Sequence, residues 1–160
     1  MYRKILLTHD GSEIAELAVP HAVTISKATG AAVVLLQVID SVAGLVSRLT
    51  PMIEPVPSGE MTVDLAEQIE ETQQQSAQEN LDRVKAELQA QGVGEVTTKV
   101  LEGPAGDAVI DAANELGCDL IVVATHGRSG FGRALLGSVA DHVVRHSKNQ
   151  AVLLVRPPGG

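Results

Sequence analysis

The chain has 160 residues, a formal net charge of −8, 44% hydrophobic residues and one cysteine, which suits a single domain with its own core. The acidic balance and the scarcity of aromatic residues argue against a nucleic-acid partner, and the single cysteine fits a reducing compartment. The N-terminal apolar run is too short for a signal peptide or a membrane span, so we expect a cytoplasmic protein with no membrane partner.

The first forty residues predict a strand, a helix and a second strand. The strand at residues 4–8 stops before Asp10, and Ser12 is a good N-cap for a helix that ends at Gly30. Apolar residues at helical spacing define the inner face of this helix, and we interpret His21 on that face as a core histidine. Residues 32–39 are almost all apolar, as in a strand covered on both faces.

Residues 41–62 interrupt the alternation of strands and helices. Three prolines and two glycines fall within them, and a structureless connection of this length is usually a lid or a binding loop. We therefore predict an irregular insertion, with a short helical turn at Leu45, Val46 and Leu49. Residues 63–92 then predict a long amphipathic helix. Its expected inner stripe is Leu65, Ile69, Ala77, Leu81, Val84 and Leu88.

The last third of the chain repeats the alternation. Residues 96–101 are half polar and predict an edge strand, and Gly103-Pro104 opens a helix that ends at Gly117. Residues 119–123 predict a buried strand, which a glycine-rich loop connects to a helix at residues 139–147. We expect Val139, Val143 and Val144 to form the inner face of that helix. Residues 151–155 predict the final strand, and residues 157–160 are a tail.

Strands that alternate with helices predict an α/β fold, with a parallel sheet between two layers of helices. The simplest doubly wound solution for one domain over residues 1–160 has five strands in the order 3-2-1-4-5. Ligands bind such sheets at the carboxyl ends of the strands, where the chain changes direction. Asp10 ends strand 1 and the glycine loop leaves strand 4, so both are expected at that crevice. Asp10 could also serve only to cap the following helix.

The loop at residues 124–138 has the chemistry of an anion site. Its glycines let backbone N–H groups approach a phosphate, and the start of the next helix adds positive potential. Thr125, Ser129 and Ser138 supply hydroxyl groups, and Arg128 and Arg133 supply the only formal charges between residues 125 and 140. A loop of this kind can also be only a tight turn.

Taken whole, the chain resembles the universal stress protein family, in its nucleotide-binding branch. The resemblance includes the opening at residues 4–12, Val38-Ile39-Asp40 and the Gly137-Ser138 helix start. The family's ATP signature, Gly-x2-Gly-x9-Gly-Ser/Thr, falls on Ala124, Gly127, Gly137 and Ser138. Ala124 replaces its first glycine, and Thr8 stands where many members carry proline. The resemblance implies a Rossmann-like fold similar to adenine-nucleotide alpha-hydrolases.

The resemblance also implies roles for individual positions around a bound ATP, AMP or ADP. Asp10 would lie near the nucleoside or near a phosphate-bound Mg²⁺ or Mn²⁺, Val38 would present its backbone to adenine, and the outer phosphates would lie at Gly137, Ser138 and Val139. The expected nucleotide site is Thr8, His9, Asp10, Val38, Val123, Ala124, Thr125, His126, Gly127, Arg128, Gly130, Gly137, Ser138 and Val139. Contacts from Arg128 and Gly130 are inferred from charge and position alone. His126 could donate to phosphate or face solvent.

The family resemblance further suggests a homodimer through the last strand, Ala151 to Val155, since an exposed apolar edge invites pairing. We expect a regulatory nucleotide-binding module of the stress response with slow ATP hydrolysis at most, because no Gly-Lys-Ser/Thr motif or loop lysine is present. Two alternatives remain: a dimeric interaction protein without nucleotide, and an adenylyl-transferring enzyme.

Three other residues have simpler interpretations. His142 and His146 could share a helix face but lack an evident third metal ligand, and Cys118 is interpreted as a core residue.

Overall fold

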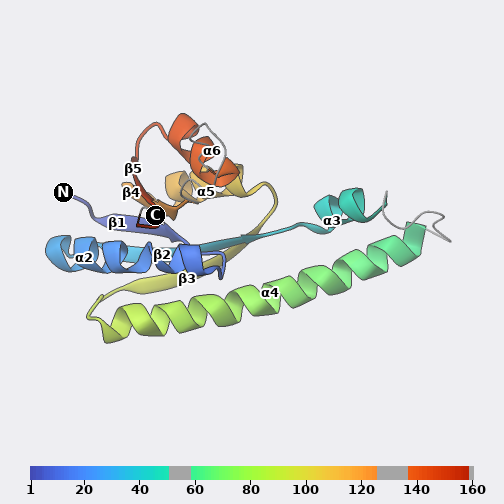
Figure 1. Cartoon of the computed structure of the whole chain (residues 1–160), viewed down its shortest axis with the longest axis horizontal. Helices are drawn as coiled ribbons and strands as arrows, with labels where there is room; N and C mark the ends of the chain where they lie inside the picture. Colours follow the sequence, from blue (N-terminus) through green and yellow to red (C-terminus); the bar gives the residue numbers. More distant parts are fainter. Residues whose placement is uncertain (51–58, 126–136, 159–160) are drawn as a thin grey trace.

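The structure, a computed structural model, describes residues 1–50, 59–125 and 137–158. Strands and helices alternate along nearly the whole chain (Figure 1). The elements are β1 Lys4–Thr8, α1 Glu13–Glu16, α2 Val19–Thr29, β2 Ala32–Ile39, α3 Val42–Leu49, α4 Gly59–Ala90, β3 Val96–Glu102, α5 Ala105–Glu115, β4 Leu120–Ala124, α6 Ser138–His146 and β5 Ala151–Val155.

The five strands form one parallel sheet in the order β3-β2-β1-β4-β5, which confirms the predicted topology. In the register, β1 pairs with β2 from Lys4↔Ala32 to Thr8↔Leu36, and with β4 at Ile5↔Leu120. The chain leaves β1 toward one side of the sheet and later returns to its other side as β4. The carboxyl ends of β1 and β4 therefore meet at the change of direction, where a parallel sheet binds ligands.

The core lies on both faces of the sheet, because successive residues of a strand point to opposite faces. On one face, Ile5 and Leu7 pack with residues of α2 and α4, including the fully buried Leu81. On the other face, Leu6 and Ile121 pack with residues of α5 and α6. The structure therefore has the predicted three layers. None of its described helices is long and apolar enough to cross a membrane.

The single helix predicted between Ser12 and Gly30 is wrong, because the structure divides it into α1 and α2. Pro20 lies in the first turn of α2, and a proline has no N–H with which to continue a helix that precedes it. Ser12 does cap α1, where its side chain accepts a hydrogen bond from the Ala15 N–H. The break also rotates the expected face, so that His21 is exposed rather than in the core.

The predicted irregular insertion at residues 41–62 is also too long. Residues 42–49 form the complete helix α3, and α4 already begins at residue 59. Ser41 caps α3 by accepting a hydrogen bond from the Gly44 N–H, and Leu45 is buried. The three prolines lie at 51, 55 and 57, outside the described residues. Figure 1 shows α3 beside the first part of α4, where both project past the sheet.

The inner stripe of α4 is correct from Ala77 onward and wrong at its start. Ala77, Leu81, Val84 and Leu88 are fully buried, but Leu65 is 39% exposed and Ala66 is buried in its place. This part of α4 contacts α3 rather than the sheet, so a different face of the helix is covered. Val144 on α6 is likewise exposed, whereas Val143 is buried as expected.

Helices α5 and α6 approach closely at Gly106. A Cβ atom added at Gly106 would lie 2.6 Å from Cγ and 2.8 Å from Cβ of His142, so no methyl group fits without movement. We expect Gly106→Ala to lower the free energy of unfolding by about 1–3 kcal/mol, the usual cost of overpacking. Urea unfolding of the variant measures this cost. The double variant Gly106→Ala/His142→Ser should recover most of it, and equal losses in both variants would contradict the contact.

Candidate functional site

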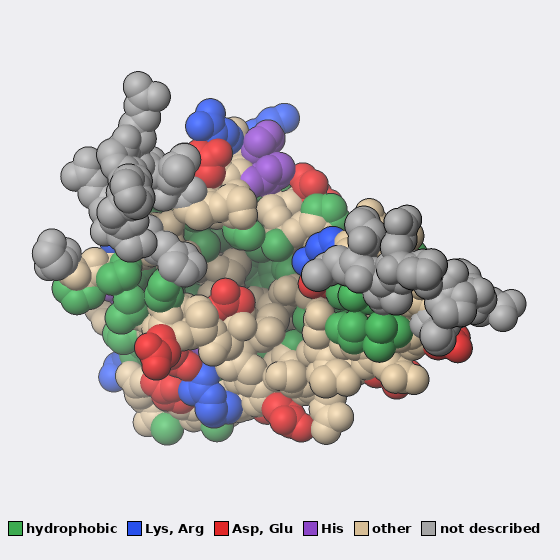
Figure 2. All heavy atoms as spheres, turned by 45° about the vertical axis from the view of Figure 1, so that its right-hand side comes forward, with side chains coloured by type: hydrophobic (Ala, Val, Ile, Leu, Met, Phe, Trp, Pro, Cys, Tyr) green, Lys and Arg blue, Asp and Glu red, His purple; other side chains and the backbone are tan. Residues whose placement is uncertain are grey.

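A crevice opens at the carboxyl ends of β1 and β4. Its volume is about 590 Å³ when the space open to solvent is included. Figure 2 shows a hollow in the corresponding face of the molecule, with hydrophobic side chains inside it. The lining residues are Thr8, His9, Asp10, Ser12, Ile14, Ala15, Leu36, Val38, Ala105, Val109, Val123, Ala124 and Val139.

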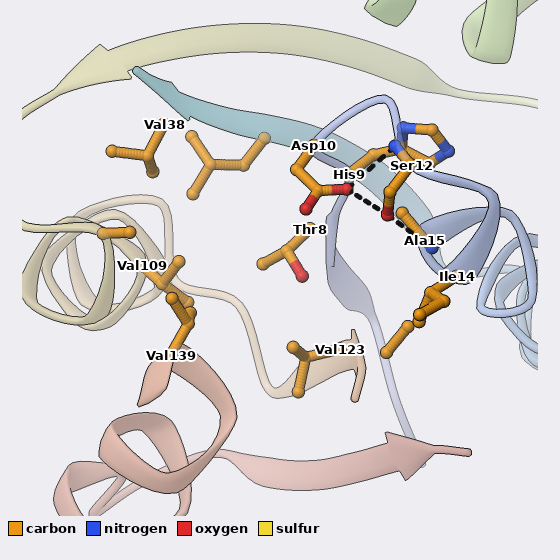
Figure 3. A pocket seen from close by; sticks show the side chains of 13 residues that line it. Thr8, His9, Asp10, Ser12, Ile14, Ala15, Val38, Val109, Val123 and Val139 are labelled. Carbon is orange, nitrogen blue, oxygen red and sulfur yellow. Dashed lines mark hydrogen bonds between the residues drawn. The ribbon is translucent and has the colours of Figure 1, made fainter. Parts of the chain in front are cut away.

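The polar groups of the crevice lie at the end of β1, and aliphatic side chains form its walls. In Figure 3, Thr8 and Asp10 face the open space, with Val109 and Val139 across from them. The Thr8 hydroxyl lies 3.5 Å from the carbonyl oxygen of Val122. A mostly apolar cleft with a few converging polar groups is typical of a site for a flat organic ligand.

Asp10 is held in place by Ser12, two residues further along. One oxygen, Oδ1, accepts hydrogen bonds from the Ser12 backbone N–H at 3.0 Å and the Ser12 hydroxyl at 2.6 Å. Burial alone would raise the pKa of the Asp10 carboxyl, but these hydrogen bonds outweigh it and hold the pKa below its ordinary value. The carboxylate is therefore charged at neutral pH. Its other oxygen could accept a ligand hydroxyl or bind a cation.

Strand β2 continues past the end of β1, and the backbone of Val38 faces the space beyond that end. The N–H of His9 donates to the carbonyl of Leu36 at 2.9 Å, so the hydrogen-bonding groups of Leu36 point toward β1. In a parallel sheet these directions alternate along the strand, and the N–H and C=O of Val38 therefore point the same way. The paired register of β1 and β2 ends at Thr8↔Leu36. Val38 thus offers one donor and one acceptor to the crevice.

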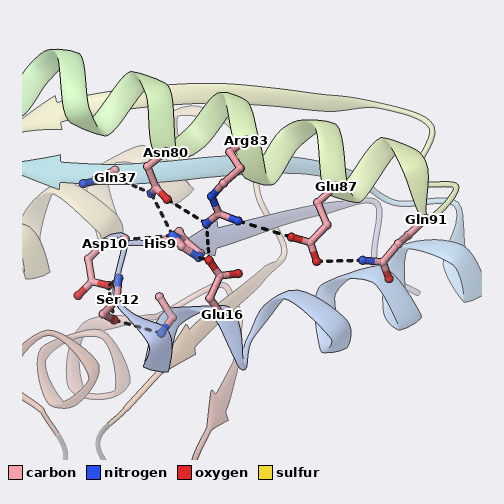
Figure 4. A network of polar contacts seen from close by, with 11 residues as sticks. His9, Asp10, Ser12, Glu16, Gln37, Asn80, Arg83, Glu87 and Gln91 are labelled. Atoms are coloured by element: carbon pink, nitrogen blue, oxygen red, sulfur yellow. Dashed lines mark hydrogen bonds and ion pairs between the residues drawn. The ribbon is translucent and has the colours of Figure 1, made fainter.

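His9 is 2% exposed, and its side chain takes part in a polar network with residues of α4 (Figure 4). Its Nδ1 accepts from the Gly11 N–H at 3.2 Å and lies 3.0 Å from the Asn80 amide nitrogen. The Nδ1 atom is therefore the acceptor of a neutral imidazole, and Nε2 carries the proton, 3.4 Å from Glu16. Asn80 belongs to α4, so this network ties α4 to the turn that carries Asp10.

Burial lowers the pKa of His9; Glu16 opposes this effect and Arg83 adds to it. The native state therefore binds a proton less readily than the unfolded chain, whose histidines titrate near about 6.5. The stability that the buried neutral His9 contributes is complete above that pH and decreases as the pH drops below it. We expect urea unfolding between pH 7.5 and 5 to show a smaller loss of stability in His9→Asn than in the wild type. Parallel curves would contradict this account of His9.

The described residues contain no cluster of three or more metal-ligating side chains. His142 and His146 do share a face of α6 with stacked rings, but His142 pairs with Asp107 at 2.9 Å and His146 Nδ1 lies 2.8 Å from the backbone carbonyl of His142. Cys118 is buried, as predicted, and burial raises the pKa of its thiol. A cation at the crevice would therefore rely on Asp10 and on oxygens of its ligand.

Comparison with known proteins gives the same family as the sequence motif at residues 124–138. Residues 1–156 match the universal stress protein family. The chain belongs to this family. Universal stress protein MJ0531 of Methanocaldococcus jannaschii is 32% identical over 158 residues, which cover 99% of this chain and 84% of MJ0531.

Two solved structures extend the comparison to the fold. Hypothetical protein MJ0577, from the same organism, has a TM-score of 0.77 and 26% identity, with coverage of 100% of this chain and 99% of that chain. A crystal structure of a universal stress protein in complex with cAMP has a TM-score of 0.66 and 24% identity and covers 97% of each chain. At this identity the second likeness shows the fold alone.

The two ends of the universal stress protein signature lie close together, beside the crevice. Ala124 ends β4 and lines the crevice, and Gly137 is the N-cap of α6. The next residue, Thr125, is buried, and its hydroxyl accepts a hydrogen bond from the Gly137 N–H at 3.1 Å. Ser138 is exposed at the start of α6. His126, Gly127, Arg128 and Gly130, together with Ser129 and Arg133, lie outside the described residues.

Several residues that line the crevice were not predicted from the sequence. They are Ser12, Ile14, Ala15, Leu36, Ala105 and Val109. Ala105 and Val109 come from the first turns of α5, the helix that connects β3 to β4. Their only sequence signal was the rule that each helix after a strand begins at the ligand-binding edge of a parallel sheet. That rule places the first turns of α1, α5 and α6 around one crevice.

Proposed function

We propose that this universal stress protein binds an adenine nucleotide, ATP in particular, in the crevice between β1 and β4. The observation that carries the proposal is the Val38 backbone, which offers a donor and an acceptor between aliphatic walls. Adenine presents an amino donor beside a ring-nitrogen acceptor on its edge, and its flat faces suit the side chains of Val109 and Val139. The Asp10 carboxylate would accept from ribose hydroxyls.

The phosphates would extend from the crevice toward the start of α6. There Gly137 and Ser138 provide a small residue and a hydroxyl beside a helix N-terminus, a favourable place for an anion. His126, Gly127, Arg128 and Gly130 would complete this part of the site, with Mg²⁺ or Mn²⁺ held by the phosphates and Asp10. The complex of another universal stress protein with cAMP supports the proposal, because there the same fold holds an adenine nucleotide.

The protein would act as a regulatory module rather than an efficient enzyme. Phosphoryl transfer needs positioned phosphates, a cation and a group that orients water or accepts a proton. Among the described residues of the crevice, His9 is turned into the α4 network and Asp10 is fixed by Ser12, so neither is placed to activate water. We therefore expect slow hydrolysis at most.

A second candidate function is that of a dimeric interaction protein that binds no nucleotide. Ala124 in place of the first signature glycine favours it.

For both candidate functions we propose a homodimer through β5, which is an edge of the sheet with partly exposed apolar residues. Light scattering at micromolar concentration should give twice the mass of the chain, 16.7 kDa. The mass of a single chain would refute the dimer.

Denaturing the purified protein and identifying any released nucleotide tests which candidate function is correct. The matched variant is Gly137→Val, which should crowd the proposed phosphate site. Among the described residues, a Cβ atom on Gly137 would meet only Thr125 Oγ1, in ordinary contact at 3.8 Å, and circular dichroism shows whether the variant is folded. Adenine nucleotide released from the wild type and not from the folded variant supports the proposal. Equal adenine-nucleotide contents in the two proteins would contradict the phosphate site.

A further inference from the structure

The outer edge of β3 presents backbone groups that have no partner among the described residues. On its inner side, the Val33 N–H donates to the Glu95 carbonyl and the Gly103 N–H donates to the Ile39 carbonyl. The odd-numbered residues of β3 therefore bond to β2, and the even-numbered residues point their N–H and C=O groups outward. These outward residues are Val96, Thr98, Val100 and Glu102. Because β3 is the last strand of the sheet, they form an open edge about seven residues long.

A long groove lies beside this edge, between β3 and α4. It is lined by Val42, Glu67, Glu70, Glu71, Gln74, Gln75, Gln78, Glu79, Asp82, Val100 and Glu102. Six of these residues carry carboxylates, and none of the described residues that line the groove is a lysine or an arginine. The groove is therefore strongly negative and ready to form hydrogen bonds along its length. We call it the β3–α4 groove.

The negative charges at one end of the groove are crowded together. Loss of hydration and the nearby carboxylates of Glu102, Glu67 and Glu71 raise the pKa of Glu70. Like charges on α4 and β3 repel, and they repel less when a cation lies between them. The nearest basic residue of β3, Lys99, points to the other face, where it pairs with Glu115 of α5. A partner with positive charge would relieve this crowding.

The open edge and the groove together suit a partner in an extended, strand-like conformation. Strand addition uses the unpaired backbone groups of an edge for affinity and alternate side chains for specificity. The acidic face of α4 from Glu67 to Asp82 spans about 22 Å at 1.5 Å per residue, which matches a strand of about seven residues at 3.3 Å per residue. Every second side chain of an added strand would point toward α4.

We propose that the β3–α4 groove binds an extended segment of another protein whose alternate residues are Lys or Arg, as an additional strand next to β3. The N–H and C=O groups of Thr98 and Val100 would pair with the backbone of the segment. Its basic side chains would lie over the carboxylates of α4. This interaction does not require nucleotide in the crevice, so it can be tested apart from the proposed function.

Fluorescence anisotropy with a labelled peptide, Lys-Thr-Lys-Thr-Lys-Thr-Lys, tests the proposal. A peptide of the same composition with its lysines in one block is the control for charge alone. The alternating peptide should bind at least about tenfold more tightly, since only it can make the strand hydrogen bonds and the charge contacts together. Equal binding of the two peptides, or no binding of the alternating one, would overturn the proposal.

Two protein variants separate the edge from the charges. In Thr98→Pro the outward N–H is lost while the bonds to β2 remain, because proline is tolerated where its nitrogen faces solvent; Thr98→Ala is the matched control. We expect Thr98→Pro, and the triple variant Glu67→Gln/Glu70→Gln/Glu71→Gln, each to weaken binding about tenfold. Unchanged binding in folded Thr98→Pro would refute strand addition. If Thr98→Pro does not fold, a peptide N-methylated at alternate residues tests the same bonds on the wild type.

Discussion

Replacing Val38 with proline is expected to weaken adenine-nucleotide binding at least about tenfold, the cost of leaving one hydrogen-bonding group without its partner. Proline removes the N–H that faces the crevice and leaves the carbonyl. The bonds between β2 and β3 are made by the neighbouring residues, so the sheet keeps them. Calorimetric titration with ATP in the presence of Mg²⁺ measures the change.

Val38→Ala is the matched control, because it shortens the side chain and keeps both backbone groups. Val38 is only half-buried, so its two lost methyl groups should cost about half of the roughly 0.8 kcal/mol each that full burial gives, and the variant should bind nucleotide within about fivefold of the wild type. Equal affinities in the folded proline and alanine variants would show that the backbone of Val38 does not contact the base. Thermal unfolding of both variants shows whether the sheet is intact.

Leu81→Ala should cause a large loss of stability. Leu81 is fully buried between α4 and the sheet, and removing a leucine side chain from a core costs about 2–5 kcal/mol. In a domain of this size each kcal/mol lowers the melting temperature by about 2–4 °C. Differential scanning calorimetry should therefore show a clear downward shift. We expect Leu81→Ala to weaken nucleotide binding only through loss of folded protein.

The same substitution at Leu65, on the same helix, is the control. Leu65 is 39% exposed, so Leu65→Ala should change the free energy of unfolding by no more than about 0.5 kcal/mol. A large loss at Leu65 together with a small one at Leu81 would reverse the assignment of the α4 faces. It would restore the stripe that the sequence predicted for the start of this helix.

The fold could be predicted because its signals are local and repeated. Apolar runs such as residues 32–39 identify buried strands, and the right-handed crossover rule then leaves few sheet orders. The errors arise where tertiary contacts decide the outcome. Leu65 and Ala66 are adjacent, and only the contact with α3 determines which of them is buried. At residues 41–62, the prolines and glycines indicated an irregular segment, whereas Ser41 and the apolar residues that follow it form the capped helix α3.

The candidate site could be predicted in part for the same reason. Asp10, Val38 and Ala124 stand at strand ends, which topology alone brings to one edge. The role of the His9 side chain could not be predicted, because its partner Asn80 lies 71 residues away on α4. The aliphatic wall at Ala105 and Val109 depends on how α5 packs. The open edge of β3 was predicted as an edge strand, but its acidic neighbour follows from the position of α4.

Above all, we propose that an adenine base binds against β2 in the crevice. The most direct measurement is calorimetric titration of nucleotide-free protein with ATP and with AMP, in the presence of Mg²⁺ or Mn²⁺, for the wild type and Val38→Pro. We expect saturable binding of adenine nucleotide by the wild type, which is lost or at least about tenfold weaker in the variant. Failure of the wild type to bind any adenine nucleotide, with either metal ion present, would contradict the claim.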